Sequence, residues 1–455
     1  MKTALLLILV FSINVLSQVK SGPIVGAVDD HSATFLVKTY TEQKVRIKII
    51  PLDDINFFTE SIKSLDTNFN YVKIKVDNLK PDTKYYYQAE VDGILELPIN
   101  SFTTFPEKDN IDFSFGFASC QQSSYAKWDP KIFPIIAQDK DLRFFIQIGD
   151  WTYPDTTERK YGYRFNSKWN LLDKSYQSKY DANYPFTREV LNHMPVSYVY
   201  DDHDFAANNP DGTDSNKQKS ISAYKMFFPH YPLANPNNGI WQKFNFSNVD
   251  FFVLDLRSQR SSMENAFDKS GKLNLDKDYS ILAGFTISGQ NQKDWFFSEL
   301  KNSKAKWKVI VSTVIFNPSY AKVLDDDTLM SRYSWMKKDV IDKWAGYKSE
   351  LNEVIKFIKD NNIKNIIFIS GDTHSSYIDD GTNSEFPEIS ASNLDVPNSH
   401  VMEKMMEVNL NIWNKGYYKE DGHAFGKVTF KNNKALLEVI DDKGNVVVTH
   451  TIDAK

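Results

Sequence analysis

Cysteine is almost absent from this chain, since Cys120 is the only one in 455 residues. A single thiol cannot form a disulfide within the chain, so the fold has to hold without one. The formal net charge is only −5, which gives no electrostatic reason to expect nucleic acid as a partner. After the first 17 residues no segment approaches 18 unbroken apolar residues, so we expect no membrane span in the mature chain.

The first 17 residues have the pattern of a secretory signal peptide. Lys2 gives a positive start, residues 4–16 are predominantly apolar, and Val15 and Ser17 occupy the −3 and −1 positions of a cleavage site. We therefore expect a secreted, extracytoplasmic protein from which residues 1–17 are removed, with an uncleaved N-terminal anchor as the alternative. The acceptor sequence at Asn245, Asn-Phe-Ser, agrees with export and predicts a glycoprotein.

The chain is too long for one ordinary domain, and its pattern changes near residue 110. Residues 22–107 contain short alternating runs about ten residues apart, which predicts an all-β sandwich of the fibronectin III or Ig-like kind. Its strands are expected at residues 34–38, 45–50, 71–76, 84–91 and 101–106. A packed accessory domain is favoured over a binding module. From residue 111 to 455 apolar strands alternate with helical stretches, as in an α/β domain.

Nine strands and two helices are expected in the second region. The strands are at residues 112–119, 143–148, 195–200, 250–255, 307–313, 365–370, 424–430, 435–440 and 446–452. The helices are at residues 290–301 and 347–361. Residues 442–445 should form a hairpin turn, and the polar, Tyr-rich stretch 155–195 has the composition of an insertion.

Four strand ends carry side chains of the kinds that bind metals. They are Cys120, Asp150 with Tyr153, Asp201-Asp202-His203-Asp204, and Asp372 with His374. Because open α/β sheets collect their sites at the carboxyl ends of strands, we expect these side chains to meet in one pocket. Carboxylate and phenolate together suit a trivalent ion such as iron.

The segment from Asp201 to Asp204 follows an apolar strand. Asp202 is placed to bind a metal, and His203 to hydrogen-bond a phosphoryl oxygen or to protonate a leaving group. Asn208 and Asn209 are further amide-oxygen donors, although such residues are often ordinary loop residues. A solvated acidic turn is the alternative for the segment.

Two arginines, Arg257 and Arg260, lie just beyond the strand at 250–255. A guanidinium aimed into an acidic metal site would neutralise the non-bridging oxygens of a phosphate ester and stabilise charge at the transition state. A surface salt bridge is the alternative, more so for Arg260 than for Arg257.

Cys120 has three interpretations. Free cysteines are often inert core residues. A cysteine nucleophile would need a dedicated histidine base and an oxyanion hole. The neighbouring ligand-type residues favour the third interpretation, a thiolate bound to a cation that lowers the pKa of the thiol.

Taken in this order, the motifs resemble those of the PhoD-like alkaline phosphatase and phosphodiesterase family, metallophosphatases related to the purple acid phosphatases. The matching segments are Ala118-Ser119-Cys120-Gln121, Gly149-Asp150 with Tyr153, Asp201-Asp202-His203-Asp204 with Asn208-Asn209, Asp255-Leu256-Arg257, Trp344-Ala345-Gly346-Tyr347, Ser370-Gly371-Asp372-Thr373-His374 and Glu388-Ile389-Ser390-Ala391-Ser392. The resemblance implies an α/β fold with a four-layer α/β/β/α metallophosphatase core, preceded by the all-β fibronectin III or Ig-like domain.

The resemblance also implies a function. The expected protein is a secreted metal-dependent phosphoric ester hydrolase acting on phosphomonoesters, phosphodiesters or both, in which a metal-bound hydroxide attacks phosphorus. Its metals would be iron (Fe3+) and one or two calcium ions (Ca2+), with other divalent metals left open. The implied metal ligands are Cys120, Asp150, Tyr153, Asp202, Asn209, Asp372 and His374, and the implied catalytic residues are His203 and Arg257.

In this family pattern Asp150 would bridge the iron to a second cation held by Asp372 and by Asp202 or Asn209. Asp202 replaces the Asn that generally precedes the catalytic His, and Asp372 stands where a purple acid phosphatase has another His. Both changes favour calcium over zinc at the second site. Bacterial members commonly carry a twin-arginine signal, whereas residues 1–17 contain no arginine, which leaves the metals open.

Two other functions compete with this hypothesis. A non-catalytic secreted recognition protein on a degenerate phosphatase scaffold would lack ligands, yet no main ligand position is missing. A cysteine-dependent hydrolase would be blocked by thiol alkylation while its metal stayed bound. The substrate, a small-molecule or polymeric phosphate ester, does not follow from these residues.

Overall fold

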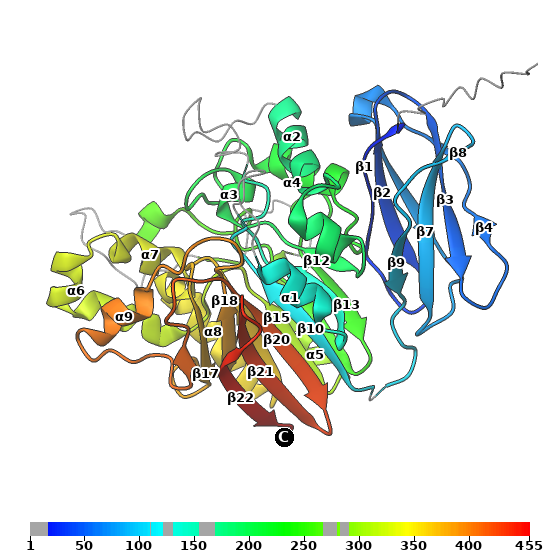
Figure 1. Ribbon diagram of the computed structural model, residues 1–455. Coiled ribbons are helices and arrows are strands. Elements are labelled where there is room, and N and C mark those ends of the chain that lie inside the picture. Colours follow the sequence, from blue (N-terminus) through cyan, green and yellow to red (C-terminus); the bar gives the residue numbers. More distant parts are fainter. Residues whose placement is uncertain (1–16, 110, 122–130, 154–168, 267–279, 283–290) are drawn as a thin grey trace, which may run out of the picture.

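The computed structural model describes residues 17–109, 111–121, 131–153, 169–266, 280–282 and 291–455. Its N-terminal part is all-β and contains two sheets (Figure 1). One sheet consists of β1 (Val19–Gly26), β2 (Ala33–Thr39) and β6 (Tyr71–Val76). The other consists of β3 (Lys44–Pro51), β4 (Phe57–Phe58), β5 (Ile62–Lys63), β7 (Lys84–Val91), β8 (Ile94–Leu95) and β9 (Asn100–Thr103).

Aromatic side chains fill the space between these two sheets. Phe35 lies with its ring centroid 4.8 Å from that of Tyr87 and 5.6 Å from that of Phe102. At the corner before β7, the backbone N–H of Lys80 donates to the Tyr85 hydroxyl at 2.8 Å. The four strands expected at 34–38, 45–50, 71–76 and 84–91 are confirmed within about two residues, a usual error for element boundaries.

The second part contains two mixed sheets. The six-stranded sheet has the order β12-β11-β10-β20-β21-β22, with β10 (Phe113–Ala118), β11 (Leu142–Gln147), β12 (Val196–Tyr198), β20 (Ala424–Lys431), β21 (Lys434–Asp441) and β22 (Val446–Asp453). The seven-stranded sheet has the order β13-β14-β15-β16-β18-β17-β19, with β13 (Gln242–Phe246), β14 (Val249–Val253), β15 (Trp307–Val311), β16 (Ile366–Ser370), β17 (Ser376–Asp380), β18 (Pro387–Ala391) and β19 (Gly416–Tyr417).

The parallel strands bring their carboxyl ends to one edge of each sheet. In the six-stranded sheet β10, β11 and β12 are parallel, and in the seven-stranded sheet β14, β15, β16 and β18 are parallel. The two sheets pack through aromatic rings, among them Phe115 with Phe251 at 5.1 Å and Trp307 with Phe430 at 5.4 Å between centroids. Side chains that follow the parallel strands of both sheets can therefore meet.

Helices cover the sheets and connect the strands. They are α1 (Ile132–Gln138), α2 (Trp169–Lys179), α3 (Asp202–Phe205), α4 (Lys217–Phe227), α5 (Gln292–Asn302), α6 (Asp327–Arg332), α7 (Met336–Asp342), α8 (Lys348–Asp360) and α9 (Val401–Met406). Segments of 3-10 helix are η1 (Asp66–Asn68), η4 (Met263–Ala266), η5 (Pro318–Asp325) and η6 (Trp344–Tyr347), and η3 (Thr187–Leu191) is a π-helical turn. Apolar residues of α5 and α8 pack on Phe252, Ile310 and Phe368 of the seven-stranded sheet.

The mixed α/β fold is confirmed, and so are the expected strands. All nine strands of the second region are present, each within about two residues of its expected bounds, and residues 442–445 do connect β21 to β22. The two expected helices correspond to α5 and α8. Part of the stretch 155–195 lies outside the described residues, and 169–179 forms α2. Within the described ranges, none of the helices is both long and apolar enough to cross a membrane.

The N-terminal domain packs firmly on the second part. Phe246 of β13 lies 4.7 Å from Phe105 and 4.0 Å from Phe113, measured between ring centroids. The Tyr231 hydroxyl donates to the carbonyl oxygen of Val28 at 2.7 Å. Buried apolar residues of both parts form one continuous core, so the two parts are expected to unfold together.

Replacing Phe246 by alanine tests this shared core. Phe246 is fully buried where the two parts meet, so Phe246→Ala should lower the free energy of unfolding by about 3–5 kcal/mol in a urea titration. The matched control is Ile55→Ala, whose side chain is 86% exposed, and it should change stability by less than about 0.5 kcal/mol. Equal effects of the two changes would contradict the packing described here.

Candidate metal centre

The ends of β10 and β11 are joined directly by the main chain. The backbone N–H of Cys120 donates to the Gly149 carbonyl at 3.1 Å, and that of Gln121 donates to the Asp150 carbonyl at 2.8 Å. These bonds hold the Cys120 and Asp150 side chains on neighbouring strand ends. Position 149 has to be glycine, because its φ is +104° and a Cβ atom there would lie 2.3 Å from Cβ of Asp201.

Three of the other predicted ligands gather around Asp150. One donor atom from each of Cys120, Asp150 and His374 lies within 4.8 Å of the others. The Tyr153 hydroxyl donates to Oδ2 of Asp150 at 2.9 Å, and the Cys120 sulfur lies 3.7 Å from the same oxygen. The structure therefore brings together the four residues that the resemblance assigned to iron.

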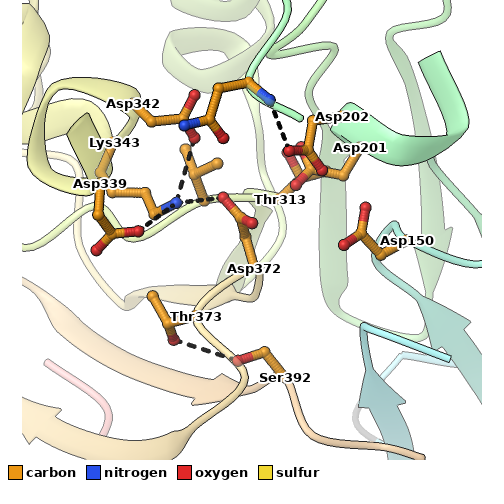
Figure 2. A network of polar contacts seen from close by, with 12 residues as sticks. Asp150, Asp201, Asp202, Thr313, Asp339, Asp342, Lys343, Asp372, Thr373 and Ser392 are labelled. Atoms are coloured by element: carbon orange, nitrogen blue, oxygen red, sulfur yellow. Dashed lines mark hydrogen bonds and ion pairs between the residues drawn. The ribbon is translucent and has the colours of Figure 1, made fainter. Parts of the chain in front are cut away.

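A second set of donors also includes Asp150. Asp150, Asp202 and His203 form one compact group of donor atoms, and Asp201, Asp202 and Asp372 form another. Figure 2 shows these carboxylates reaching one region from separate segments of the chain. Asp150 belongs to both sets, which is the arrangement expected of a bridging carboxylate.

The two asparagines of the 208–209 pair differ in their surroundings. Asn208 is exposed, whereas Asn209 is half-buried and donates its backbone N–H to Oδ2 of Asp202 at 2.9 Å. Asn209 is thus the better placed of the two for a role in the site. His203 stacks its ring on Tyr153 with centroids 4.7 Å apart.

Backbone strain marks the predicted ligands. Six of the seven have a positive φ: Cys120 (63°), Asp150 (56°), Tyr153 (41°), Asn209 (56°), Asp372 (72°) and His374 (51°). Positive φ values are uncommon for residues other than glycine, and such strain tends to cluster at functional sites. The exception, Asp202, is the first residue of α3.

Arg257 lies within this group but does not face an open space. Its guanidinium is fully buried and binds Asp201 through two nitrogens, one of them at 2.9 Å, Asp342 at 2.8 Å and Asp372 at 3.1 Å. Arg260 is also buried and binds Asp342 at 2.6 Å. The surface salt bridge considered as the alternative is wrong for both arginines, because both are inside the protein.

Asp204 belongs to the 201–204 segment expected in the site, but no separate role was predicted for it. Asp204 accepts hydrogen bonds from the backbone N–H groups of Asp150 (2.6 Å), Trp151 (2.9 Å) and Asp201 (3.0 Å), and from the Thr152 hydroxyl (2.8 Å). It thereby fixes the loop that carries Asp150. The resemblance had placed Asp204 in a motif without giving it a role, and only the folded loop reveals one.

Two further residues, Asp342 and Lys343, complete the polar network. They lie at the end of α7 and just after it, and the Lys343 ammonium contacts Asp372 (Figure 2). The matching segment Trp344-Ala345-Gly346-Tyr347 begins one residue later, and nothing in its sequence pointed to a buried ion pair ahead of it. Asp342 and Lys343 form ion pairs with Arg257, Arg260 and Asp372, which lie in other segments of the chain.

The directions of the pKa shifts indicate that the site holds more acidic groups than its positive charges balance. Burial, reinforced by neighbouring carboxylates, raises the pKa of the Cys120 thiol, of the Tyr153 phenol and of the Asp150 carboxyl well above their usual values. Burial also lowers the pKa of His374 to about 4, and the nearby His203 acts in the same direction. Burial opposes ionisation of Asp202 as well, yet the charges of His203 and Arg257 outweigh it and lower the pKa of Asp202.

These donors fit a pair of multivalent cations. A cation favours the thiolate, phenolate and carboxylate forms that burial disfavours, so binding it would remove the electrostatic cost of gathering these groups. The set around Cys120, Tyr153 and His374 mixes sulfur, nitrogen and phenolic oxygen, as a transition metal accepts. The set around Asp202 and Asp372 offers carboxylate oxygens, the ligands that suit hard cations.

A family model described as "PhoD-like phosphatase" matches residues 115–453, which is well over half of the chain. The chain belongs to the PhoD-like phosphatase family. A second model, "Domain of unknown function (DUF7800)", matches residues 16–109, the all-β part. Family membership thus confirms the resemblance inferred from the strand-end motifs.

Two relatives illustrate the similarity. "Alkaline phosphatase D" of Bacillus subtilis (strain 168) is 27% identical over 333 residues, which are 67% of this chain and 53% of that protein. The chain therefore spans about half the length of this curated relative. A solved structure titled "Structure of PhoD" is 18% identical, has a TM-score of 0.68 and covers 95% of this chain and 91% of its own, which shows a shared fold.

Replacing Asp204 tests whether it supports the site from behind. Asp204→Ala leaves several buried N–H groups without an acceptor, so we expect the free energy of unfolding to fall by about 3 kcal/mol or more in a denaturant titration. Cation binding should weaken as well, because the Asp150 loop loses its anchor. Asp181→Ala, an exposed aspartate that accepts one backbone hydrogen bond, is the control and should change neither quantity. A stable Asp204→Ala protein with unchanged cation affinity would refute this role.

Proposed function

We propose that this protein is a secreted, metal-dependent phosphoric ester hydrolase acting on phosphomonoesters, phosphodiesters or both. The observation that carries the proposal is that Asp150 belongs to two groups of donor atoms, one with Cys120 and His374 and one with Asp202 and His203. Hydrolases of phosphate esters use two cations in this way to hold the attacking and leaving oxygens of one displacement. Membership of the PhoD-like phosphatase family supports the same chemistry.

We assign iron to the set formed by Cys120, Asp150, Tyr153 and His374, and calcium to the set formed by Asp150, Asp202, Asn209 and Asp372. When bound, the ions would supply Lewis acidity to a phosphoryl oxygen and would lower the pKa of a coordinated water. The protein itself orders the donors, because the strand-end hydrogen bonds and the Asp204 carboxylate fix the loops that carry them.

His203 is the residue we assign to proton transfer. It is the second residue of α3. Its backbone N–H lies 3.3 Å from Oδ1 of Asp150, and its ring is stacked on that of Tyr153. The imidazole is half-buried next to both donor sets, where it can give a proton to the oxygen of the departing alcohol. The stacking on Tyr153 would keep the ring oriented during this step.

Arg257 takes a different role from the one first expected. A guanidinium saturated by Asp201, Asp342 and Asp372 and with no exposed surface is badly placed to touch a phosphoryl group. We therefore propose that Arg257 positions Asp201 and Asp372 rather than contacting substrate. Truncating it would leave buried carboxylates unpaired, which is strongly destabilising in other proteins.

The competing functions receive less support. Burial and the nearby Asp150 raise the pKa of the Cys120 thiol, which is the opposite of what a cysteine nucleophile needs. A degenerate recognition scaffold would have lost donors, whereas all seven predicted ligands are present in the described part of the chain. The hydrolase is therefore favoured over both.

The organisation of the chain belongs to the same proposal. We propose a signal peptide at residues 1–17, a fibronectin III or Ig-like sandwich at 22–107, and a catalytic domain at 111–455 with four-layer α/β/β/α architecture. The two packed sheets, with α5 and α8 on one of them, support the layered arrangement. Glycosylation at Asn245 is a weaker proposal, since its side-chain amide already donates to the Val249 carbonyl at 3.0 Å.

Metal analysis of the mature protein, combined with an aryl phosphate assay, tests the function. We expect retained iron, a visible absorption band from tyrosinate bound to iron, and hydrolysis that chelators abolish and metal restores. The control is thiol alkylation of the metal-loaded protein, which should leave hydrolysis unchanged because Cys120 is buried. Hydrolysis that continues unchanged after the metal is removed would refute the proposal.

Asp150→Asn tests the bridge between the two cation sites. The change keeps the shape of the side chain but removes the charge that both cations share, so the rate of ester hydrolysis should fall below about 1% of wild type. Asp360→Asn, at an exposed ion pair on α8, serves as the control and should keep full activity. Near-normal turnover by Asp150→Asn would contradict the bridging role.

A further inference from the structure

Lys343 is a buried lysine surrounded by carboxylates. Its side chain is only 2% exposed. Its ammonium forms a hydrogen-bonded ion pair with Oδ2 of Asp372 and lies 3.2 Å from Oδ2 of Asp342 and 3.3 Å from Oδ1 of Asp339. Figure 2 shows the lysine reaching from the α7 side toward Asp372, between the other two carboxylates. The side chain is thus fixed inside the protein and is not a mobile surface lysine.

The Asp372 carboxylate is held through one of its two oxygens. Oδ2 accepts from Lys343 and also from Arg257 at 3.1 Å. Within the described residues, the contacts of the Asp372 carboxylate with the Lys343 and Arg257 side chains both go to Oδ2. Oδ1 takes part in neither contact, so we take it to be the oxygen that Asp372 offers to a cation in the group it forms with Asp201 and Asp202.

The neighbours of Lys343 in the chain hold it in place from both sides. Asp342 is bound by Arg257 at 2.8 Å and by Arg260 at 2.6 Å. Trp344 donates its indole N–H to the Ser312 hydroxyl at 3.1 Å. Because the main chain is anchored before and after Lys343, the position of the ammonium is determined by the fold.

We propose that Lys343 is a positioning residue for the second cation, because it holds Oδ2 of Asp372 and so makes this carboxylate present Oδ1 alone. The inference rests on the proposed two-cation hydrolase. Carboxylates bind calcium through one or both oxygens, and partners behind a ligand decide its orientation. Lys343 thereby selects the single-oxygen mode and compensates part of the negative charge of the site.

The test is a metal-binding measurement on the full-length mature protein. Lys343→Met removes the ammonium and keeps most of the side-chain length. We expect the affinity for Ca2+, measured by competition with a chromophoric chelator, to fall about 10–100-fold. The iron bound near Cys120 should be retained in full, as measured by elemental analysis and by its absorption band. Lys343→Arg should recover most of the Ca2+ affinity, since a guanidinium can again donate to Oδ2.

Two further variants make the result decisive. Lys343→Gln is a smaller change to the interior and must show the same selective loss of Ca2+ affinity, so the test stands even where Lys343→Met does not fold. Lys356→Met, with a side chain 75% exposed on α8, is the matched control and should bind both ions as the wild type does.

The outcomes separate this inference from the function on which it rests. Unchanged or tighter Ca2+ binding by Lys343→Met and Lys343→Gln would overturn the positioning role. Loss of both ions would also overturn it, because it would make Lys343 a general structural residue. A wild-type protein that binds both ions and hydrolyses aryl phosphates would leave the function intact in either case. A wild-type protein that binds neither ion would overturn the function and this inference together.

Discussion

The gathering of negative charge at one edge of two sheets is the constraint on which the structure depends. Asp150, Asp201, Asp202 and Asp372 lie close together inside the protein. Burying so many carboxylates is unfavourable unless charge and hydrogen bonds compensate them. The protein compensates them with the Arg257 guanidinium, the Lys343 ammonium and main-chain N–H groups. The negative charge that remains uncompensated is suited to binding multivalent cations.

Part of the order in the site comes from groups that hold ligands without being ligands. Asp204 fixes the loop of Asp150 through backbone donors, and Lys343 fixes Asp372 through one oxygen. These residues belong to helices and loops, whereas the donors follow strands. The sheets bring the donors together, and the surrounding segments orient them. A preorganised site of this kind depends on both parts.

The strands and the donors at their ends could be predicted from the sequence because both depend on local pattern. An apolar run followed by Gly-Asp, as at 143–150, is visible in the sequence, and strand direction then brings its end to a shared edge. The supporting ion pairs could not be predicted in this way, because Asp342 meets Arg257 across segments far apart in the chain. The pairing of Arg257 with Asp201, Asp342 and Asp372 depends on contacts of the same kind, and it is the basis for the positioning role that we propose for this residue. The strands β17 and β19 were not predicted; they pair with each other, and such pairing depends on the partner segment more than on either sequence alone.

The left-handed backbone at six of the seven predicted ligands has a consequence for how such a site can change over time. There the main chain holds the Cα–Cβ bond of each ligand in a direction that a right-handed helical or extended backbone would not give. An exchange that preserves the distance from Cα to the donor keeps that direction, even when the chemical nature of the donor changes. A substitution that adds a methylene group to the side chain moves the donor atom beyond the position that a bound cation would occupy. Descendants of this scaffold should therefore vary their preferred ion by swapping side chains of similar reach, and seldom by lengthening them.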